Sequence, residues 1–506
     1  MILLALAAAL AQGQTYTVDA DRSEPISPYI YGANFPDWRR IGAIFPLARQ
    51  GGNRMSAYNW ENNASNAGSD WHHQNDGYLG ETDEPGWTAR TFLQEAQRYG
   101  AAVLLTVPCT GYVAADKKAD GDVGQTPDYL KTRFVRSLPR KNAPLVYPPD
   151  TKDGAVYQDE FVAWITKIAL PNTPVWFSLD NEPDLWGHTH QRIWPKNPTY
   201  AQILEIGKAY AAAIKAVAPK SLVFGPANYG WQGFRTFQGA PDANGRDFVD
   251  FYLSGMREAE KAAGRRLLDV LDIHWYPEAR GGGVRVTSRQ ATPELVAARV
   301  QAPRSLWDPT YVEDSWIAEN LGKKPIALLP GLFAQIRRQY PGTRLAITEY
   351  DYGGGSDGSG LVAQADVLGI FGRYGVFAAC HWGIGADRPA TVAGFRCFRD
   401  YDGRGGKFGS RSLKVDGGDP AVSSLYASLS PENPGRMVIV AINKSGATVP
   451  FRIALKGFRA RSALGYRRDG ANLAVPVKFS PKVEEGSVSF EAPPLSVSTV
   501  ELGGRG

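Results

Sequence analysis

Eight short apolar segments, most of them separated by helical patterns, constrain the fold of this 506-residue chain more than any other feature. Each segment has the length and residue types of a buried strand and is followed by turn residues. Strands that alternate with helices predict an α/β fold with a parallel sheet, and eight of them predict a (β/α)8 barrel. The predicted strands are 29–34, 47–55, 101–107, 174–180, 221–226, 270–275, 344–349 and 376–382, and the clearest helices are 200–218, 248–263, 331–340 and 361–374.

Two glutamates lie at the C-terminal ends of predicted strands. Glu182 follows the fourth strand in the sequence Ser-Leu-Asp-Asn-Glu-Pro, and Glu349 ends the seventh strand in Ala-Ile-Thr-Glu-Tyr. In a parallel barrel all strand C-termini converge on one face, so the two carboxylates can meet although they are far apart in the sequence. Hydrolysis of a glycosidic bond with retention needs two carboxyl groups about 5 Å apart. A single glutamate at a strand end is usually a solvated surface group, but this pair indicates a glycosidase.

The sequence after about Gly405 has a different residue pattern, with short segments typical of β-strands separated by Gly, Pro and Asn. This pattern predicts a β-sandwich over 406–506, after a catalytic barrel over 29–405. Residues 15–19 are also strand-like, and within the N-terminal segment 12–28 they can reach across to pair with the C-terminal sheet.

Residues 1–11 resemble a signal peptide. They contain a short apolar run that ends in Ala9-Leu-Ala11, although no Lys or Arg follows Met1. The alternative is a buried N-terminal helix. We expect the protein to be secreted, and no later segment reaches the apolar length needed to span a bilayer.

Composition argues against several classes of partner. The formal net charge is only +5, and no run of Lys and Arg resembles a nucleic-acid-binding arm. We therefore expect no nucleic-acid partner, no membrane partner and a monomeric protein. Cys109, Cys380 and Cys397 have no metal-ligand spacing; Cys380 and Cys397 could form a disulfide, or all three could be buried thiols.

Several stretches in chain order resemble glycoside hydrolase family 44, which contains endo-acting β-1,4-glucanases and xyloglucanases. The most specific is residues 51–71, GGNRMSAYNWENNASNAGSDW, whereas Asn-Glu-Pro at 181–183 is shared by a larger clan of retaining barrel glycosidases. The resemblance implies a (β/α)8 barrel with a β-sandwich. It also implies that Glu182 is the acid/base and Glu349 the nucleophile. The other matching stretches are 26–32, 111–116, 307–309, 313–316 and 348–354.

The two roles require different protonation states. Glu182 must hold its proton near neutral pH, which burial beside a second carboxylate favours, while Glu349 must stay ionised. We expect Arg54, at the end of the second predicted strand, to lower the pKa of Glu349, and Tyr276 or His274 to orient it. Asn181 is placed to bind the sugar 2-hydroxyl, a contact that strengthens in the transition state. Asn53 is also expected to bind substrate.

Aromatic residues near the predicted strand ends are candidate platforms for sugar rings, because each offers a large rigid surface. For any one of them, packing in the core is an equally good interpretation, and Trp382 is the one we favour for substrate. The candidates are Trp60, Trp71, Trp275, Trp316, Tyr350 and Trp382.

The resemblance also implies a structural calcium ion. Asp150, Asp153 and Asp159 offer oxygen ligands in a turn-rich segment, although Asp159 could instead cap the helix that follows. Catalysis by two glutamates requires no metal or organic cofactor.

The sequence therefore predicts a secreted, retaining endo-β-1,4-glucanase that acts on soluble or amorphous β-glucans such as carboxymethyl cellulose, with xyloglucan as a further substrate. Two alternatives stay open. The same glutamates could hydrolyse β-mannan or xylan, and a degenerate barrel could bind carbohydrate without cleaving it.

Overall fold

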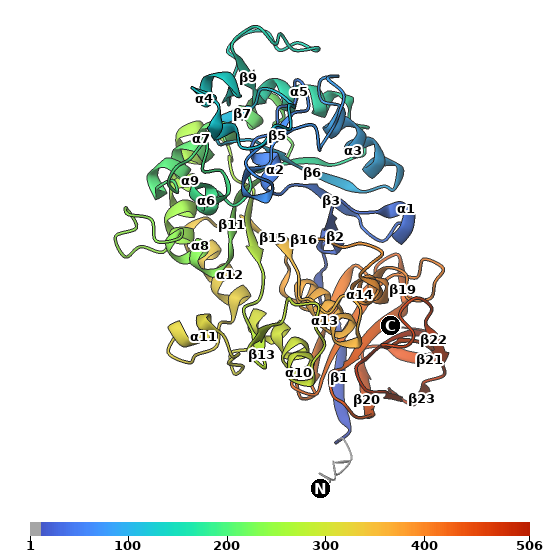
Figure 1. The fold of residues 1–506 in the computed structure, drawn as a ribbon. Helices are drawn as coiled ribbons and strands as arrows, with labels where there is room; N and C mark the ends of the chain where they lie inside the picture. The colour runs from blue at the N-terminus through green and yellow to red at the C-terminus, as the bar shows by residue number, and fades with distance from the viewer. Residues whose placement is uncertain (1–11, 506) are drawn as a thin grey trace.

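The computed structural model describes residues 12–505, so the predicted signal-peptide segment 1–11 lies outside the described residues. Two bodies are visible in Figure 1: a barrel surrounded by helices and a smaller β-rich domain beside it, formed mainly by the C-terminal part of the chain. Among the described residues, no helix combines the length and apolar character needed to cross a membrane.

Eight parallel strands close into a barrel, which confirms the predicted fold class. Its interior near the strand N-termini is apolar and includes Leu47, Leu104, Trp176 and Phe224, so the barrel is filled and has no open pore. The strands are, in barrel order, β2 (Gly32–Asn34), β3 (Leu47–Gln50), β6 (Ala102–Val107), β10 (Val175–Leu179), β11 (Val223–Tyr229), β12 (Val270–Trp275), β15 (Arg344–Tyr350) and β16 (Ala378–His381).

The second barrel strand is shorter than predicted. It ends at Gln50, and Gly52 then adopts a φ of +86°, a conformation that favours glycine and stops the strand. The short helix α2 (Asn53–Ser56) follows at once. Arg54 therefore lies on a helix above the barrel and not at the end of a strand, which changes what it can contact.

Helices cover the outside of the barrel (Figure 1). The predicted helices are present with small changes at their ends, as α7 (Tyr200–Val217), α9 (Phe248–Ala263), α12 (Leu328–Gln339) and α13 (Gly358–Tyr374). A capping box between Thr199 and Gln202 opens α7. The other helices are α1 (Trp38–Ile41), α3 (Trp87–Arg98), α4 (Tyr129–Thr132), α5 (Gln158–Ile168), α6 (Trp186–Thr189), α8 (Gly230–Thr236), α10 (Pro293–Gln301), α11 (Trp316–Asn320) and α14 (Pro389–Arg399).

The C-terminal domain is a ten-stranded sheet whose inner face encloses its own apolar core, with Val18, Met437, Ile439 and Phe451 among its members. The N-terminal strand β1 (Gln14–Pro25) lies within it, antiparallel to β17 and parallel to β20. The remaining strands are β17 (Arg411–Gly417), β18 (Ser423–Ser430), β19 (Asn433–Asn443), β20 (Val449–Lys456), β21 (Arg459–Arg468), β22 (Val477–Phe479), β23 (Lys482–Glu484), β24 (Ser487–Ala492) and β25 (Ser496–Arg505).

Helices α13 and α14 of the barrel pack against the C-terminal sheet. A buried ion pair connects the two bodies, since the Lys444 ammonium lies 2.8 Å from Asp366 Oδ2 and both side chains are almost fully buried. Tyr426 donates a hydrogen bond of 2.6 Å to the other oxygen of Asp366. Loss of either charge would leave the other buried and unpaired, which is costly, so this contact holds the two domains in one arrangement.

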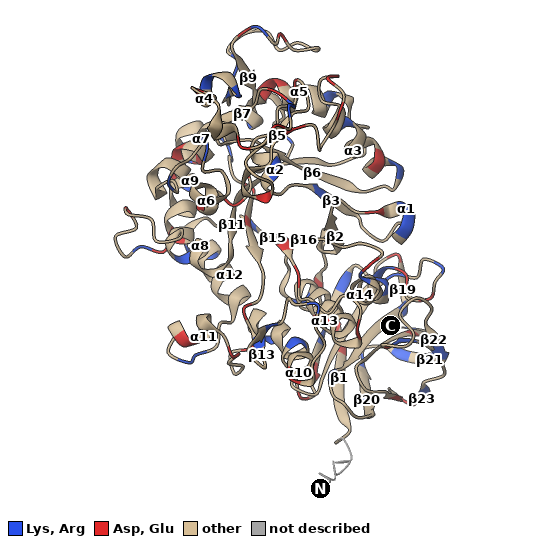
Figure 2. Ribbon diagram, viewed as in Figure 1, with Lys and Arg blue, Asp and Glu red and all other residues tan. Residues whose placement is uncertain are grey.

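Short sheets complete the loops of the barrel: β4 (Ser65–Asn66) pairs with β5 (Asn75–Asp76), β7 (Tyr112–Ala114) and β9 (Ala155–Tyr157) flank β8 (Phe134–Leu138), and β13 (Arg280–Gly281) pairs with β14 (Val284–Arg285). All three cysteines are buried free thiols, so Cys380 and Cys397 do not form a disulfide. In Figure 2, acidic and basic residues are interspersed over both domains, which agrees with the small net charge.

Candidate active site

Glu182 is presented by a strained turn after β10. Both Asp180, with a φ of +65°, and Glu182, with a φ of +42°, adopt the left-handed conformation that non-glycine residues usually avoid. The turn is held by the buried Asp180 carboxylate, which accepts hydrogen bonds from the backbone N–H groups of Cys109 and Asn181. Strain that the surroundings hold in place is typical of catalytic positions.

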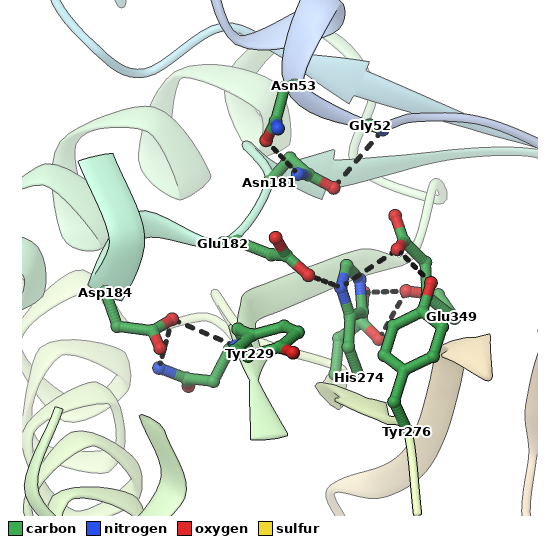
Figure 3. Close-up of polar contacts among 12 residues, drawn as sticks. Gly52, Asn53, Asn181, Glu182, Asp184, Tyr229, His274, Tyr276 and Glu349 are labelled. Atoms are coloured by element: carbon green, nitrogen blue, oxygen red, sulfur yellow. Dashed lines mark hydrogen bonds and ion pairs between the residues drawn. The ribbon is translucent and has the colours of Figure 1, made fainter. Parts of the chain in front are cut away.

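The carboxylates of Glu182 and Glu349 meet above the centre of the barrel (Figure 3). One oxygen of each lies, together with a ring nitrogen of His274, in a group whose atoms are all within 4.8 Å of one another. His274 Nδ1 is 2.7 Å from Glu182 Oε1 and 3.5 Å from Glu349 Oε2. The predicted juxtaposition of two acids from the fourth and seventh strands is therefore present in the structure.

Arg49, inside strand β3, is the cation that contacts Glu349. Its guanidinium is completely buried and donates to Glu349 Oε1 at 2.7 Å, to Asn34 Oδ1 at 2.9 Å and to Asn181 Oδ1 at 2.8 Å. A guanidinium fork suits this arrangement, because it offers several donors in fixed directions.

The prediction that Arg54 would lower the pKa of Glu349 is wrong. Arg54 forms an ion pair with Asp76, with N–O distances of 2.6 and 3.2 Å, and its guanidinium lies 4.3 Å from the centre of the Tyr78 ring. It lines the groove beside the two glutamates but does not bond to either. The error follows from the early end of β3, which places Arg54 on α2.

The surroundings of the two acids favour a state in which Glu182 is protonated and Glu349 is ionised. Burial, followed by the negative charge of Glu349, raises the pKa of Glu182 well above its ordinary value. Burial also raises the pKa of Glu349, but the charge and hydrogen bond of Arg49 and a hydrogen bond of 2.8 Å from Tyr276 Oη oppose that rise. Burial and the nearby Arg49 lower the pKa of His274 well below its usual value, so this imidazole is neutral.

Asn181 joins the catalytic pair to the loop that begins the groove. Its side-chain oxygen accepts from Arg49 and from the backbone N–H of Gly52 at 3.2 Å, and its amide nitrogen donates to Asn53 Oδ1 at 3.2 Å (Figure 3). Asn53 in turn donates to Asp70 at 2.8 Å. The predicted contact between Asn181 and a sugar hydroxyl stays a prediction.

Several polar residues of the site were not predicted from the sequence. Asp184 is fully buried, accepts from the backbone of Tyr229 at 3.0 Å, and has a pKa raised by burial to about 6. Asp272, below Arg49, accepts from Thr348 Oγ1, and burial raises its pKa to about 7. Arg49 was also not predicted. The sequence signal that could have identified Arg49 and Asp272 is a charged residue inside an apolar strand segment.

A groove of about 950 Å³, which we call the catalytic groove, lies over α2 and α3 and shares Gly52, Asn53 and Trp382 with the cavity that contains the two glutamates. Trp71 and Trp382 line it, as expected for sugar platforms, together with Phe35 and Tyr78, which were not predicted. Gly52 permits this close packing, because a Cβ atom there would lie 2.6 Å from the Trp382 ring. A smaller cavity of about 420 Å³ next to it is lined by Glu182, Glu349, Tyr229, Tyr276 and Arg285, among others.

Four of the six predicted aromatic platforms are not in the groove. Trp60, Trp275 and Tyr350 are buried, and each packs against other aromatic rings of the core, so the prediction that they stack on sugar is wrong. Trp316, at the start of α11, is half-buried against the barrel core and lines neither cavity at the glutamates.

The three aspartates predicted to hold calcium differ in their contacts. Asp150 Oδ1 accepts from the backbone N–H of Lys152, and both oxygens of Asp159 accept from the backbone N–H of Lys141, and their binding of calcium stays a prediction. Both carboxylate oxygens of Asp153 are buried and make no hydrogen bond, although the Lys141 ammonium is 3.0 Å from Oδ2.

Glu61 supplies a second available oxygen close to Asp153. It is 6% exposed, and its Oε1 has no hydrogen-bond partner. Burial, then the charges of Asp153 and Glu160, raises the pKa of Glu61 to about 8. Buried carboxylate oxygens without partners fit a hard cation such as Ca²⁺, which prefers oxygen ligands.

Comparison with known proteins is consistent with this geometry. A model of glycoside hydrolase family 44 matches residues 64–279. "Endoglucanase A" of Paenibacillus lautus is 37% identical over 525 residues, which cover 98% of this chain and 73% of that protein. "Beta-mannanase/endoglucanase A" of Caldicellulosiruptor saccharolyticus is 40% identical over 461 residues, which cover 85% of this chain and 34% of that protein. The chain thus spans about three quarters of the Paenibacillus lautus protein and about a third of the Caldicellulosiruptor saccharolyticus protein.

A solved structure of a family 44 xyloglucanase from Paenibacillus polymyxa, determined with xyloglucan, has the same fold, with a TM-score of 0.90. Its sequence is 36% identical, and the match covers 97% of this chain and 100% of that chain. A barrel with two facing glutamates, together with these relatives, defines a glycoside hydrolase. The chain belongs to glycoside hydrolase family 44 and is an endoglucanase, which confirms the resemblance and the enzyme class predicted from the sequence.

The contrast between Arg49 and Arg54 can be tested by the same substitution at both positions. A lysine at position 49 cannot reach three acceptors at once, so it stabilises the ionised form of Glu349 less well. Because the rate falls as pH drops through the pKa of Glu349, Arg49→Lys should move the acidic limb of kcat/KM to higher pH, by up to about 1 unit. It should also lower kcat/KM at least about tenfold.

The control is Arg54→Lys, which changes an arginine that lines the groove but has no contact with Glu349. It should leave the acidic limb in place. A shift caused by Arg54→Lys, with none for Arg49→Lys, would contradict the assignment.

Proposed function

We propose that this enzyme hydrolyses β-1,4-glucan chains internally with retention, through a covalent glycosyl-enzyme. The observation that carries the proposal is the distance of at most 4.8 Å between oxygens of Glu182 and Glu349. Retaining glycosidases hold their carboxyl groups about 5–5.5 Å apart, whereas inverting enzymes need about 6.5–9.5 Å to admit a water molecule between acid and base. The shorter separation leaves direct attack by one carboxylate as the favoured route.

In the first step, Glu182 donates its proton to the glycosidic oxygen while Glu349 attacks the anomeric carbon, so the leaving chain departs as a neutral alcohol. Arg49 and Tyr276 hold Glu349 in position through one oxygen each. As Glu349 becomes an ester it loses its charge, and the pKa of Glu182 falls because its closest negative neighbour is gone. Glu182 then acts as the base that activates water, which releases the sugar and restores Glu349.

The alanine variants of the two glutamates should respond differently to azide. Glu182→Ala should lower kcat on β-glucan by about 10²–10⁴-fold, the usual contribution of a general acid. It should still release dinitrophenol from a dinitrophenyl β-cellotrioside, because that leaving group needs no proton, and azide should yield a β-glycosyl azide. Glu349→Ala should be inactive on both substrates without azide; with azide, it should convert the dinitrophenyl substrate to an α-glycosyl azide.

Product analysis by nuclear magnetic resonance distinguishes the two anomers. Exchanged outcomes, with the β-azide from Glu349→Ala, would reverse the two roles. Near-normal turnover by Glu349→Ala or Glu349→Gln would refute the nucleophile altogether.

We propose soluble or amorphous β-glucans, including xyloglucan, as substrates. The groove of about 950 Å³ is lined by both Trp71 and Trp382, so sugar rings can bind beside each of them, which suits a polymer substrate. A relative with xyloglucanase activity in its name supports decorated chains. The relative named a mannanase as well as an endoglucanase keeps β-mannan as the alternative, although this chain matches only 34% of it.

Rates on a polysaccharide panel separate these substrates. Carboxymethyl cellulose and xyloglucan should both release reducing ends, with a rapid fall in viscosity, as internal cleavage requires. Faster release from β-mannan or xylan than from either glucan would favour the alternative, and no release from any of them would indicate a noncatalytic carbohydrate-binding barrel.

We also propose that the protein acts outside the cell as a monomer. The signal-peptide-like residues 1–11 support export, and the small net charge with interspersed signs offers no obvious electrostatic partner surface.

We propose that a calcium ion binds at Glu61 and Asp153 and stabilises the loops that carry them. The ion would neutralise the oxygens that Lys141 leaves unpaired, and its binding would displace the proton that Glu61 holds near neutral pH. It would take no part in the reaction.

Thermal unfolding at pH 7 tests this site. Calcium at about a hundred times its dissociation constant should stabilise the fold by about 2.7 kcal/mol relative to EDTA. Glu61→Gln should lose most of that difference, whereas Asp150→Asn, next to the site but bonded within its own turn, should keep it. Equal melting temperatures with calcium and with EDTA would mean that no calcium binds there and that Lys141 alone neutralises the negative charge of Glu61 and Asp153.

A further inference from the structure

Large apolar side chains exposed on the described surface are concentrated in two grooves. Three of them, Phe35, Trp71 and Tyr78, belong to the catalytic groove. Four others line a second groove of about 670 Å³ on the flank of the barrel, between α3, α5 and the loop before β9. Exposed apolar residues scattered singly are normal, but a contiguous group in a groove marks a binding site. These four are Val146, Tyr147, Ile168 and Leu170.

The second groove, which we call the flank groove, has a rigid aromatic ring in its wall. Tyr147 stacks on Trp164, with ring centres 4.8 Å apart and planes 6° from parallel, and Trp164 stacks in turn on the buried Trp60. The Tyr147 hydroxyl donates to the backbone oxygen of Pro85 at 3.0 Å. The ring is therefore fixed, while 42% of the residue stays exposed. A fixed, partly exposed aromatic ring offers an apolar face to a ligand at little entropic cost.

Polar side chains border this ring. Arg90, Gln94, Gln97 and Lys167 line the flank groove, and the Gln97 amide nitrogen makes no hydrogen bond in the structure. Arg90 is held in place by Glu84, with an N–O distance of 2.9 Å between Nη2 and Oε2. An apolar surface with a few amide and guanidinium donors matches a sugar ring, which has an apolar face and hydroxyl groups around its edge.

Helix α3 separates the flank groove from the catalytic groove. Its residues Thr88, Thr91, Phe92 and Glu95 line the catalytic groove, whereas Arg90, Leu93, Gln94 and Gln97 line the flank groove. Both sets follow the i, i+3, i+4 spacing of one helix face, and they lie on opposite faces. Figure 1 shows α3 and α5 next to each other on this side of the barrel. A helix with its side chains is about 10–12 Å across, so the two grooves are close neighbours.

We propose that the flank groove is a second binding site for the β-glucan chain, separate from the catalytic groove. The proposal rests on the proposed function, since the ligand is the polysaccharide that the catalytic groove cleaves. A polymer long enough to contact both grooves, or a neighbouring chain in the same particle, gains affinity through effective concentration. A short oligosaccharide that fills only the catalytic groove gains nothing.

The test compares polysaccharide binding with oligosaccharide hydrolysis in the same variants. Tyr147→Ala removes the ring, and Tyr147→Phe, the matched control, keeps the ring but removes the hydroxyl. Binding is measured as retardation in native gels that contain xyloglucan or hydroxyethyl cellulose, with Glu349→Gln in each protein to prevent cleavage. Tyr147→Ala should weaken binding about 3- to 10-fold, the scale of one lost aromatic contact, and Tyr147→Phe should bind like the parent.

In proteins with Glu349 intact, kcat/KM on cellohexaose should be the same for the parent, Tyr147→Ala and Tyr147→Phe. A fall in this value for Tyr147→Ala would mean that the ring acts through Trp164 and Trp60 on the catalytic groove, and would overturn the proposal. A second variant, Gln94→Ala, changes an exposed side chain of α3 that has no part in the core. It should weaken polysaccharide binding in the same direction.

The two proposals fail in distinguishable ways. If the parent enzyme cleaves no β-glucan, the proposed function is wrong. If it cleaves β-glucan normally but neither Tyr147→Ala nor Gln94→Ala changes retardation, the flank groove does not bind glucan and the proposed function stands.

Discussion

The arrangement of the active site depends on one completely buried arginine. A guanidinium out of contact with water is tolerated only where opposite charges and acceptors surround it. Arg49 has Glu349 and Asn181 above it, Asn34 beside it and Asp272 below. Its charge thus fixes the position of Glu349 and, through Asn181, the strained turn that carries Glu182. Two acids from distant strands are aligned by one side chain on a third.

That alignment also explains how two neighbouring acids can perform different tasks. Both are buried, which favours the neutral form of each, and their mutual repulsion opposes double ionisation. Of the two acids, Arg49 and Tyr276 bond only to Glu349, so the single negative charge belongs there. His274 contacts both acids but remains neutral, and it orients them without competing for the charge.

The sequence allowed the barrel and the meeting of Glu182 and Glu349 to be predicted, because both depend on short-range patterns: apolar strands, helical spacing and the position of a residue relative to a strand end. The predictions were wrong where contacts between residues far apart in the sequence determine the position of a side chain. Arg54 was expected to contact Glu349 because the second strand was predicted to run to Met55, whereas β3 ends at Gln50, before Gly52. Trp60 and Trp71 look alike in sequence, yet one is buried against Trp164 and the other lines the groove. Likewise, Glu61 lies far along the chain from Asp153, so no local pattern could join them.

The place of β1 in the C-terminal sheet has a consequence for how the molecule is assembled. This strand is made early in synthesis but lies between β17 and β20, so its partners appear only after the whole barrel sequence has been made. Closing a loop of this length is slow, and until then both edges of β1 are unpaired. The domain beside the barrel therefore cannot be completed by the C-terminal part of the chain alone, and its assembly requires the two ends of the polypeptide to come together.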